Sequence, residues 1–182
     1  MRDSGCRRDA GGARFRILKD FLLPAAAAIA VRPLKAGHRK LWEPHWAGYQ
    51  RFYKVSFTPE VIDTTWRRLM DPSEPMHALG AFEGEVLLGI VHYIFHRSTW
   101  TIGNYCYLQD LYTDPARRKR GVGRALIEAV YAAATKAGAA RVYWLTAQDN
   151  TEARALYDKV ASFAGFIQYR SEERRVGKEC RL

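Results

Sequence analysis

The chain has 182 residues, the size of one domain, and 48% of them are apolar, which excludes a disordered chain. Its three cysteines, Cys6, Cys106 and Cys180, are far apart and form no CxxC pair. We therefore expect neither a disulfide framework nor a metal site, and we place the protein in the reducing cytoplasm. The formal net charge is +10, but residues 1–27 and 170–182 supply half of this excess. No run of Lys and Arg with interleaved aromatic residues indicates nucleic-acid binding.

Both ends look foreign to the domain between them. Residues 1–27 mix Arg, Gly and Ala without periodicity, and their apolar run is too short to span a membrane. We interpret them as a disordered or misassigned extension, with a secretory signal as the alternative. Residues 170–180, RSEERRVGKEC, resemble the in-frame translation of a sequencing-library adapter, with a natural charged tail as the alternative. We therefore expect a domain over residues 28–169, a non-native tail over 170–182 and no membrane partner.

Between these ends the pattern alternates between strands and helices. In chain order, we expect a strand at Ala28–Leu34, helices at His38–Lys54 and Val61–Met70, strands at Met76–Phe82, Val86–Phe95 and Asn104–Thr113, a helix at Gly121–Ala137, a strand at Val142–Leu145, a helix ending near Val160 and a strand at Gly165–Tyr169. Four local signals set these bounds: Thr58 before Pro59 as a helix cap, Glu83-Gly84-Glu85 as a hairpin turn, Gly138 as a helix stop, and Asp149-x-x-Glu152 as a capping box that opens the last helix.

The segment after Asn104–Thr113 carries the strongest functional signal, DPARRKRGVGRA over residues 114–125. The backbone N–H groups at the start of the following helix have no helical partner, and the helix dipole favours negative charge there, so this turn is an anion site. Gly121 and Gly123 let a ligand approach the backbone closely. Four basic side chains surround the same turn: Arg118, Lys119, Arg120 and Arg124. A solvated basic turn before an ordinary helix is the alternative, because Gly-x-Gly alone is a weak motif.

Arg118-x-x-Gly121-x-Gly123, placed after a strand, resembles the pyrophosphate loop of the GNAT superfamily, the acetyl-CoA-dependent N-acetyltransferases. Asn150-Thr-Glu-Ala-Arg-Ala-Leu-Tyr157-Asp-Lys, after the next strand, resembles the family's second motif. The resemblance covers about residues 28–169 and is closest to histone and polyamine acetyltransferases and their bacterial relatives. The segments that carry this closer resemblance are Leu41-Trp42, Gly48-Tyr49-Gln50-x-Phe52-Tyr53, Thr99-Trp100 and Asp110-Leu-Tyr112.

The resemblance implies an α/β (α+β) fold with a mixed, mostly antiparallel, V-shaped sheet flanked by helices. The fourth and fifth strands would splay apart to admit the pantetheine arm of acetyl-CoA, the co-substrate. This arm would pair with the backbone of Leu111, Tyr112 and Thr113, one N–H of which would bind the thioester carbonyl, and Asn150 would lie beside the arm. The pyrophosphate would lie on the loop residues Arg118, Lys119, Arg120, Gly121, Val122, Gly123 and Arg124.

The resemblance singles out Tyr157 as the general acid that protonates the departing thiolate. A phenol with an unperturbed pKa of about 10 stays protonated at neutral pH and can donate to a thiolate whose pKa is about 8.5. A tyrosine packed in the core is the alternative.

The general base is left open by the sequence. Diamine acetyltransferases, which this strand resembles, carry Glu-Asp where this chain has Gln109-Asp110, and Gln109 cannot take a proton. Asp110 could act through water, but strand alternation turns it to the face opposite Gln109, where it could serve a structural partner instead. Bulk water or a chain of waters is the remaining alternative.

Two further groups of side chains carry weaker signals. His92 and His96 lie four residues apart on one strand, so about 13 Å separates their Cα atoms, too far to bind one metal together. We expect ordinary strand histidines, with a position facing the acceptor cleft as the alternative for either one. One face of the helix His38–Lys54 carries aromatic residues, which we expect in the core, with outer members that could wall the acceptor pocket and attract a cationic amine. They are Trp42, Trp46, Tyr49 and Tyr53.

These features favour an enzyme that moves an acetyl group from acetyl-CoA to a primary amine by direct attack in a ternary complex. The acceptor could be a polyamine, a small amino compound or a protein lysine, and no cysteine lies where an acyl-enzyme would need one. The alternative is a non-catalytic domain that binds an acyl-CoA, in which Tyr157 would have no task. GNAT relatives in this branch often dimerise through their C-terminal strands, so the resemblance also implies a homodimer.

Overall fold

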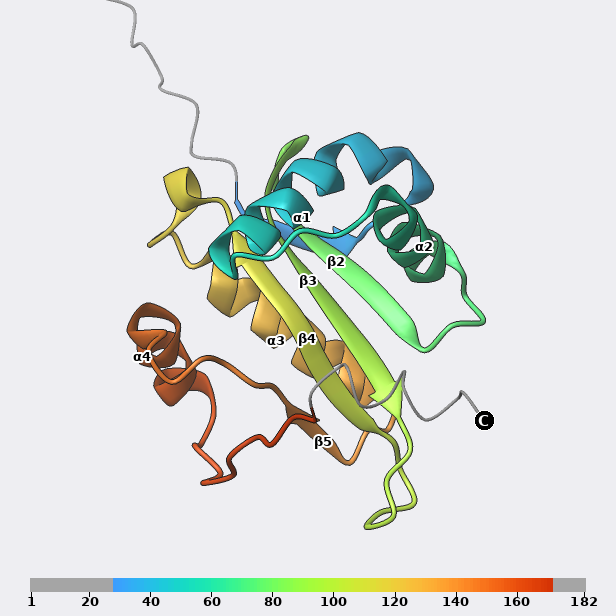
Figure 1. Ribbon diagram of the computed structural model, residues 1–182, viewed down its shortest axis with the longest axis vertical. Helices are drawn as coiled ribbons and strands as arrows, with labels where there is room; N and C mark the ends of the chain where they lie inside the picture. The colour runs from blue at the N-terminus through green and yellow to red at the C-terminus, as the bar shows by residue number, and fades with distance from the viewer. Residues whose placement is uncertain (1–27, 172–182) are drawn as a thin grey trace, which may run out of the picture.

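A five-stranded sheet with strand order β1-β2-β3-β4-β5 forms the centre of the protein (Figure 1). The computed structural model describes residues 28–171, so the expectations for residues 1–27 and for the tail after Ser171 lie outside the described residues. The strands are β1 (Ala30–Pro33), β2 (Met76–Glu83), β3 (Val86–His96), β4 (Tyr105–Thr113) and β5 (Arg141–Tyr143). The first four pair antiparallel and β5 pairs parallel to β4, which confirms the mixed, mostly antiparallel sheet.

Helices cover both faces of this sheet. In chain order they are the 3-10 turn η1 (Ala36–His38), α1 (Arg39–Phe52), α2 (Pro59–Met70), the 3-10 turn η2 (Pro115–Arg117), α3 (Val122–Lys136) and α4 (Thr151–Val160). Figure 1 shows α1 and α2 in front of the sheet and α3 behind it. No helix within residues 28–171 is long and apolar enough to cross a membrane.

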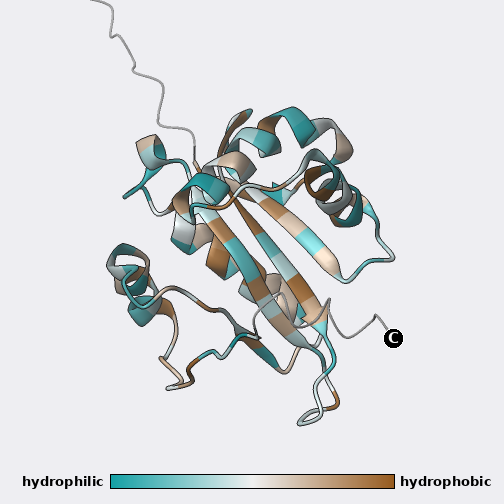
Figure 2. Ribbon diagram, in the orientation of Figure 1, coloured by the Kyte–Doolittle hydropathy of each residue, from teal (hydrophilic) through white to brown (hydrophobic). Residues whose placement is uncertain are grey.

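The side chains of the sheet divide into two cores because alternate residues of a strand point to opposite faces. Figure 2 shows hydrophobic residues along β3, a strand that contributes side chains to both cores. On the α3 face, Leu126, Ile127 and Val130 pack with apolar residues of β2, β3 and β4. On the other face, Trp42 and Trp66 pack with residues of β2 and β3. Burying one such side chain contributes about 1.5–3 kcal/mol, so these two layers hold the sheet between its helices.

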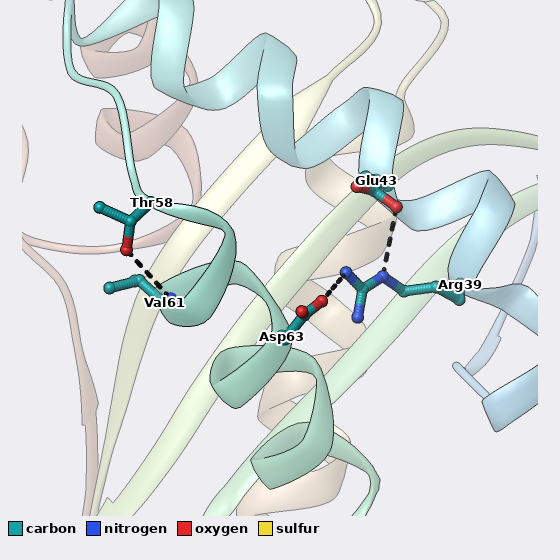
Figure 3. A network of polar contacts seen from close by, with 5 residues as sticks. All are labelled: Arg39, Glu43, Thr58, Val61 and Asp63. Carbon is teal, nitrogen blue, oxygen red and sulfur yellow. Dashed lines mark hydrogen bonds and ion pairs between the residues drawn. The ribbon is translucent and has the colours of Figure 1, made fainter.

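Polar contacts fix α1 against α2 (Figure 3). The Arg39 guanidinium lies 3.3 Å from a Glu43 oxygen on its own helix and 2.7 Å from an Asp63 oxygen on α2. Thr58 caps α2 as expected, because its hydroxyl accepts a hydrogen bond from the N–H of Val61 at 3.4 Å. These contacts join α1 to α2, and the aromatic face of α1 packs on the sheet.

Two local expectations are wrong. The strand expected at Gly165–Tyr169 does not form: residues 161–171 have no regular secondary structure. A strand needs a partner backbone, and β5 pairs over only three residues and with β4 alone. The capping box at Asp149 is also wrong, since Asn150 caps α4 by accepting a hydrogen bond from the N–H of Ala153 at 3.4 Å. Glu152 is therefore free to form an ion pair elsewhere.

Candidate active site

The anion loop lies where β4 ends and α3 begins. Asp114 starts the turn by accepting a hydrogen bond from the N–H of Ala116 at 3.0 Å. Gly121 caps α3 with φ +83°, a left-handed conformation that favours glycine. Its neighbour Gly123 has a packing role, because a Cβ there would lie 3.2 Å from Leu156 Cδ2 of α4. Val122 is 1% exposed, so its side chain belongs to the core and only its backbone N–H is available to a ligand.

The basic side chains of the loop point to acidic partners in different elements. Arg118 donates to Glu152 of α4 at 2.9 Å, and Arg120 pairs with Glu83 at the end of β2. Arg124 lies 3.7 Å from Glu128 within α3. Lys119 has φ +60° and forms no ion pair with any residue in the described part of the chain. No sequence pattern indicates that Glu83 and Glu152 are the acidic partners, since both are distant from the loop along the chain and glutamate is common on any surface.

The half of β4 next to this loop is not paired with β5. β5 pairs with β4 only at Tyr105–Tyr107, so the second half of β4 has β3 on one edge and no strand of the described chain on the other. This confirms the expected splay of the fourth and fifth strands. Leu111, Tyr112 and Thr113 lie on that free edge, where an extended ligand arm can pair with their backbone.

Asn150 is the residue that caps the start of α4. Its side-chain amide donates to Thr146 Oγ1 at 3.1 Å and caps the helix with its oxygen. A cavity of about 390 Å³ adjoins it and is lined by Phe52, Tyr53, Lys54, Ala147, Asp149, Asn150, Thr151 and Glu152.

A second cavity of about 540 Å³ lies between α1 and the end of β4. Its walls are Pro44, His45, Gly48, Arg51, Phe52, Tyr112, Asp114, Pro115 and Arg118. Phe52 lines both cavities, so the two are neighbours at the end of α1. Gly48 shapes this wall, because a Cβ there would collide with the ring of Tyr112.

A β-bulge decides which way Asp110 points. On β3, Tyr93 is opposite Leu108 and the next residue, His92, is opposite Asp110, so Gln109 is an extra, exposed residue. Simple alternation would turn Asp110 to the same face as Leu108, into the α3-side core. The bulge shifts the alternation of side chains between the two faces of the sheet by one residue, so Asp110 points toward α1 instead.

Asp110 is buried there, at 8% exposure, and is bordered by polar side chains. One carboxylate oxygen lies 3.0 Å from His92 Nδ1, and His92 Nε2 accepts a hydrogen bond from the indole N–H of Trp42 at 2.9 Å. Burial, and then the negative charge and hydrogen bond of Asp110, raise the pKa of Tyr49. The same two causes, burial first and then the charge of Asp110, raise the pKa of Tyr53 and Tyr107. Asp110 therefore acts electrostatically on three phenols.

Tyr157 lies on α4 and packs edge-on against Trp144 at a centroid distance of 5.3 Å. Burial, and then the neighbouring Tyr53, raise its pKa to about 12, so the phenol is protonated at neutral pH. Tyr53 is thus the common neighbour of Tyr157 and Asp110. Through Tyr53, the electrostatic surroundings of these two candidates are linked, although they are far apart along the chain.

His92 has a more specific structural role than the sequence pattern predicts. His92 was expected to be an ordinary strand residue, but it is 3% exposed and connects Trp42 to Asp110. His96, at the end of the same strand, lies 2.9 Å from the hydroxyl of Tyr143. Within residues 28–171, no cluster of three His, Cys, Asp or Glu side chains is arranged to bind a metal. The role of His92 depends on strand register, which the sequence pattern does not show.

Comparison with known proteins identifies the family of the chain. Residues 40–163 match the acetyltransferase (GNAT) family. The D-amino-acid N-acetyltransferase HPA3 of Saccharomyces cerevisiae is 36% identical over 144 residues, which cover 78% of this chain and 89% of that protein. A thialysine N-epsilon-acetyltransferase of Caenorhabditis elegans is 34% identical over 101 residues, covering 55% of this chain and 62% of that protein.

Solved structures show the same fold. The ribosomal-protein-alanine N-acetyltransferase from Brucella melitensis biovar Abortus 2308 superposes with a TM-score of 0.69 at 21% identity, covering 80% of this chain and 99% of that one. The aminoglycoside N-acetyltransferase AAC(6')-Iy in complex with CoA superposes with a TM-score of 0.67 at 16% identity, covering 84% and 99%. Family match, curated relatives and fold agree: this chain belongs to the GNAT family of N-acetyltransferases and is an acyltransferase.

Proposed function

We propose that the protein transfers the acetyl group of acetyl-CoA to the primary amine of a free amino acid. The observation that carries the proposal is Asp110, a buried carboxylate bordered by tyrosines and close to the open edge of β4. A buried carboxylate attracts an ammonium group, and the aromatic rings add cation–π attraction. The similar proteins named for D-amino-acid and thialysine acetylation act on acceptors of this class.

The acceptor's carboxylate would need a cationic partner, and the larger cavity offers one. Arg51 of α1 lines it, and among the described residues Arg51 has no ion-pair partner. Arg118 lines the same cavity, but Glu152 occupies its guanidinium. An arginine binds a carboxylate through two parallel hydrogen bonds, which suits an amino acid better than a polyamine.

The loop and the free edge of β4 are the parts that fit acetyl-CoA. Residues Arg118–Arg124 would hold the pyrophosphate with backbone N–H groups and positive side chains. Leu111, Tyr112 and Thr113 would pair with the pantetheine arm, and one of their N–H groups would stabilise the oxyanion. Asn150 would border the arm from α4.

Two side chains would move the protons. Asp110 would take the proton of the acceptor's ammonium through a water molecule, which leaves a neutral amine to attack the thioester carbonyl. Tyr157 would give its proton to the sulfur as the C–S bond breaks. Burial keeps Tyr157 protonated, and a departing thiolate in the same buried site is also a stronger base than in water.

The burial and protonation of Cys106 favour direct attack of the amine on the thioester over a mechanism with an acyl-enzyme intermediate. This thiol, the one cysteine within residues 28–171, is fully buried in the α3-side core. Burial raises its pKa to about 11, so it is a thiol and not a thiolate at neutral pH.

An acceptor panel tests the proposal. We expect thiol release from acetyl-CoA with free amino acids of either hand, at a kcat/KM at least tenfold above that for a polyamine or a lysine-containing peptide. The measurement is continuous detection of the free thiol with the full chain. Preference for the polyamine or the peptide would contradict the amino-acid assignment. Tight acetyl-CoA binding without thiol release for any acceptor would support the non-catalytic alternative.

We further propose a homodimer in which a second copy covers the segment 161–171. Four large apolar side chains in it are 75–88% exposed: Phe163, Phe166, Ile167 and Tyr169. Light scattering should give twice the chain mass, and replacing Phe166 and Ile167 together by Asp should shift it to the monomer mass. The exposed Ile102 at the turn between β3 and β4 offers a control, since Ile102→Asp should leave the mass unchanged. A monomeric wild type would contradict the dimer.

A further inference from the structure

Trp42, His92 and Asp110 form a hydrogen-bonded row that runs from α1 through β3 to β4. Trp42 is fully buried, His92 is 3% exposed and Asp110 is 8% exposed. The row runs from the indole N–H of α1 to His92 Nε2 over 2.9 Å, and from His92 Nδ1 to the carboxylate over 3.0 Å. The mechanism proposed above uses the last member of this row only.

The indole N–H of Trp42 determines which ring nitrogen of His92 carries a proton. An indole N–H can only donate a hydrogen bond, so His92 Nε2 must be the acceptor and carries no proton. A neutral imidazole has one N–H, which is then on Nδ1 and donates to the carboxylate of Asp110. A second proton, on Nε2, would face the indole N–H and break that hydrogen bond.

Aromatic packing confines the buried ring of His92. Its ring lies 6.0 Å from that of Trp42 and 5.1 Å, edge-on, from that of Trp46, so α1 confines it from one side. Ala78 is opposite it on β2 and carries no titratable group. From β4, the group that faces it is Asp110. A neutral donor in this position orients the carboxylate and leaves its negative charge uncompensated.

We propose that Trp42 and His92 are positioning residues that hold Asp110 as an oriented, uncompensated anion for the acceptor's ammonium. His92 supplies one N–H, and Trp42 ensures that this N–H points at the carboxylate. A histidinium at the same place would neutralise Asp110 and weaken the attraction of a cationic acceptor. This inference rests on the proposed role of Asp110 in acceptor recognition.

Two substitutions at His92 separate positioning from mere packing. His92→Leu removes the N–H and keeps most of the volume, whereas the amide of His92→Asn can still donate from a position near that of Nδ1. We expect kcat/KM for the acceptor to fall about tenfold in His92→Leu, mainly through KM, and to stay within about threefold of wild type in His92→Asn. Acetyl-CoA affinity, measured by calorimetry, should change in neither. Equal losses in the two variants, or no loss in His92→Leu, would overturn the inference.

Asp110→Asn makes the two levels of the proposal distinguishable. If Asp110→Asn keeps the wild-type KM for the acceptor, the proposed role of Asp110 itself is wrong. If Asp110→Asn raises that KM but His92→Leu does not, only the positioning inference is wrong. Nitrogen NMR of the wild type gives an independent reading: we expect the neutral His92 tautomer with its proton on Nδ1 at neutral pH. Observation of the Nε2–H tautomer or of a histidinium would overturn the inference without any variant.

Discussion

Tyr157→Phe is expected to lower turnover about a hundredfold, equivalent to about 2.7 kcal/mol of transition-state stabilisation, while acetyl-CoA affinity changes less than twofold. The substitution removes the proton donor and keeps the ring, so the packing against Trp144 is retained. Because burial raises the pKa of Tyr157 to about 12, the wild-type phenol is protonated throughout the neutral range and is available as an acid. The measurements are kcat from thiol release and Kd from calorimetry.

Tyr131→Phe is the matched control. The hydroxyl of Tyr131 donates to the backbone carbonyl of Val160, the last residue of α4, at 2.9 Å, so its loss should cost about 1 kcal/mol of stability. It also removes one phenol next to α4, but Tyr131 is not part of the opening beside β4. Turnover in this control should stay near wild type. Wild-type turnover in a folded Tyr157→Phe variant would contradict the acid role and would leave Tyr157 with a packing role only.

The sequence predicted most of the fold because local patterns determined most of its elements. The aromatic residues of α1 recur at helical spacing, and Thr58 before Pro59 marks the start of α2. Glu83-Gly84-Glu85 turns the hairpin between β2 and β3, with Gly84 at φ +59°. Each of these signals lies within a few residues of the element that it defines, so no tertiary information is needed to find them.

The two local errors come from competition that the sequence cannot resolve. Asp149 and Asn150 are both good caps, and the neighbouring tertiary contacts decide between them, since Glu152 forms an ion pair with Arg118 and does not close a capping box. The segment Gly165–Tyr169 has the composition of a strand but finds no partner backbone in the described part of the chain. Strand propensity alone does not provide such a partner.

Only those residues of the candidate site that belong to a recognisable sequence motif could be predicted from the sequence. The sequence pattern predicts the loop Arg118–Arg124 as an anion site, and the resemblance of its segment to the family's second motif predicts the role of Tyr157. The orientation of Asp110 was not predicted, because the bulge at Gln109 reverses the alternation of β4. The contact of Asp110 with His92 depends on the register between β3 and β4, and that of His92 with Trp42 depends on how α1 packs over the sheet.

Gly121→Glu should weaken acetyl-CoA binding at least thirtyfold, equivalent to about 2 kcal/mol. Gly121 caps α3 with its backbone in the left-handed region, and a Cβ there would meet no atom within 4 Å, so the new side chain has room to enter the anion site. Its carboxylate would place negative charge at the helix N-terminus, where the pyrophosphate is expected to lie. Calorimetric titration with acetyl-CoA measures the change.

Gly138→Glu, at the other end of the same helix, separates this effect from backbone strain. Gly138 also has a positive φ, +66°, and open space around its Cβ position, so both variants carry the same strain and the same added charge. Each should lose about 1–2 kcal/mol of stability. Only Gly121→Glu should lose acetyl-CoA affinity, because only that end of α3 faces the loop. Equal affinities in the two variants would show that the pyrophosphate does not lie at the start of α3, and its site should then be sought along the cavity lined by Arg51 and Arg118.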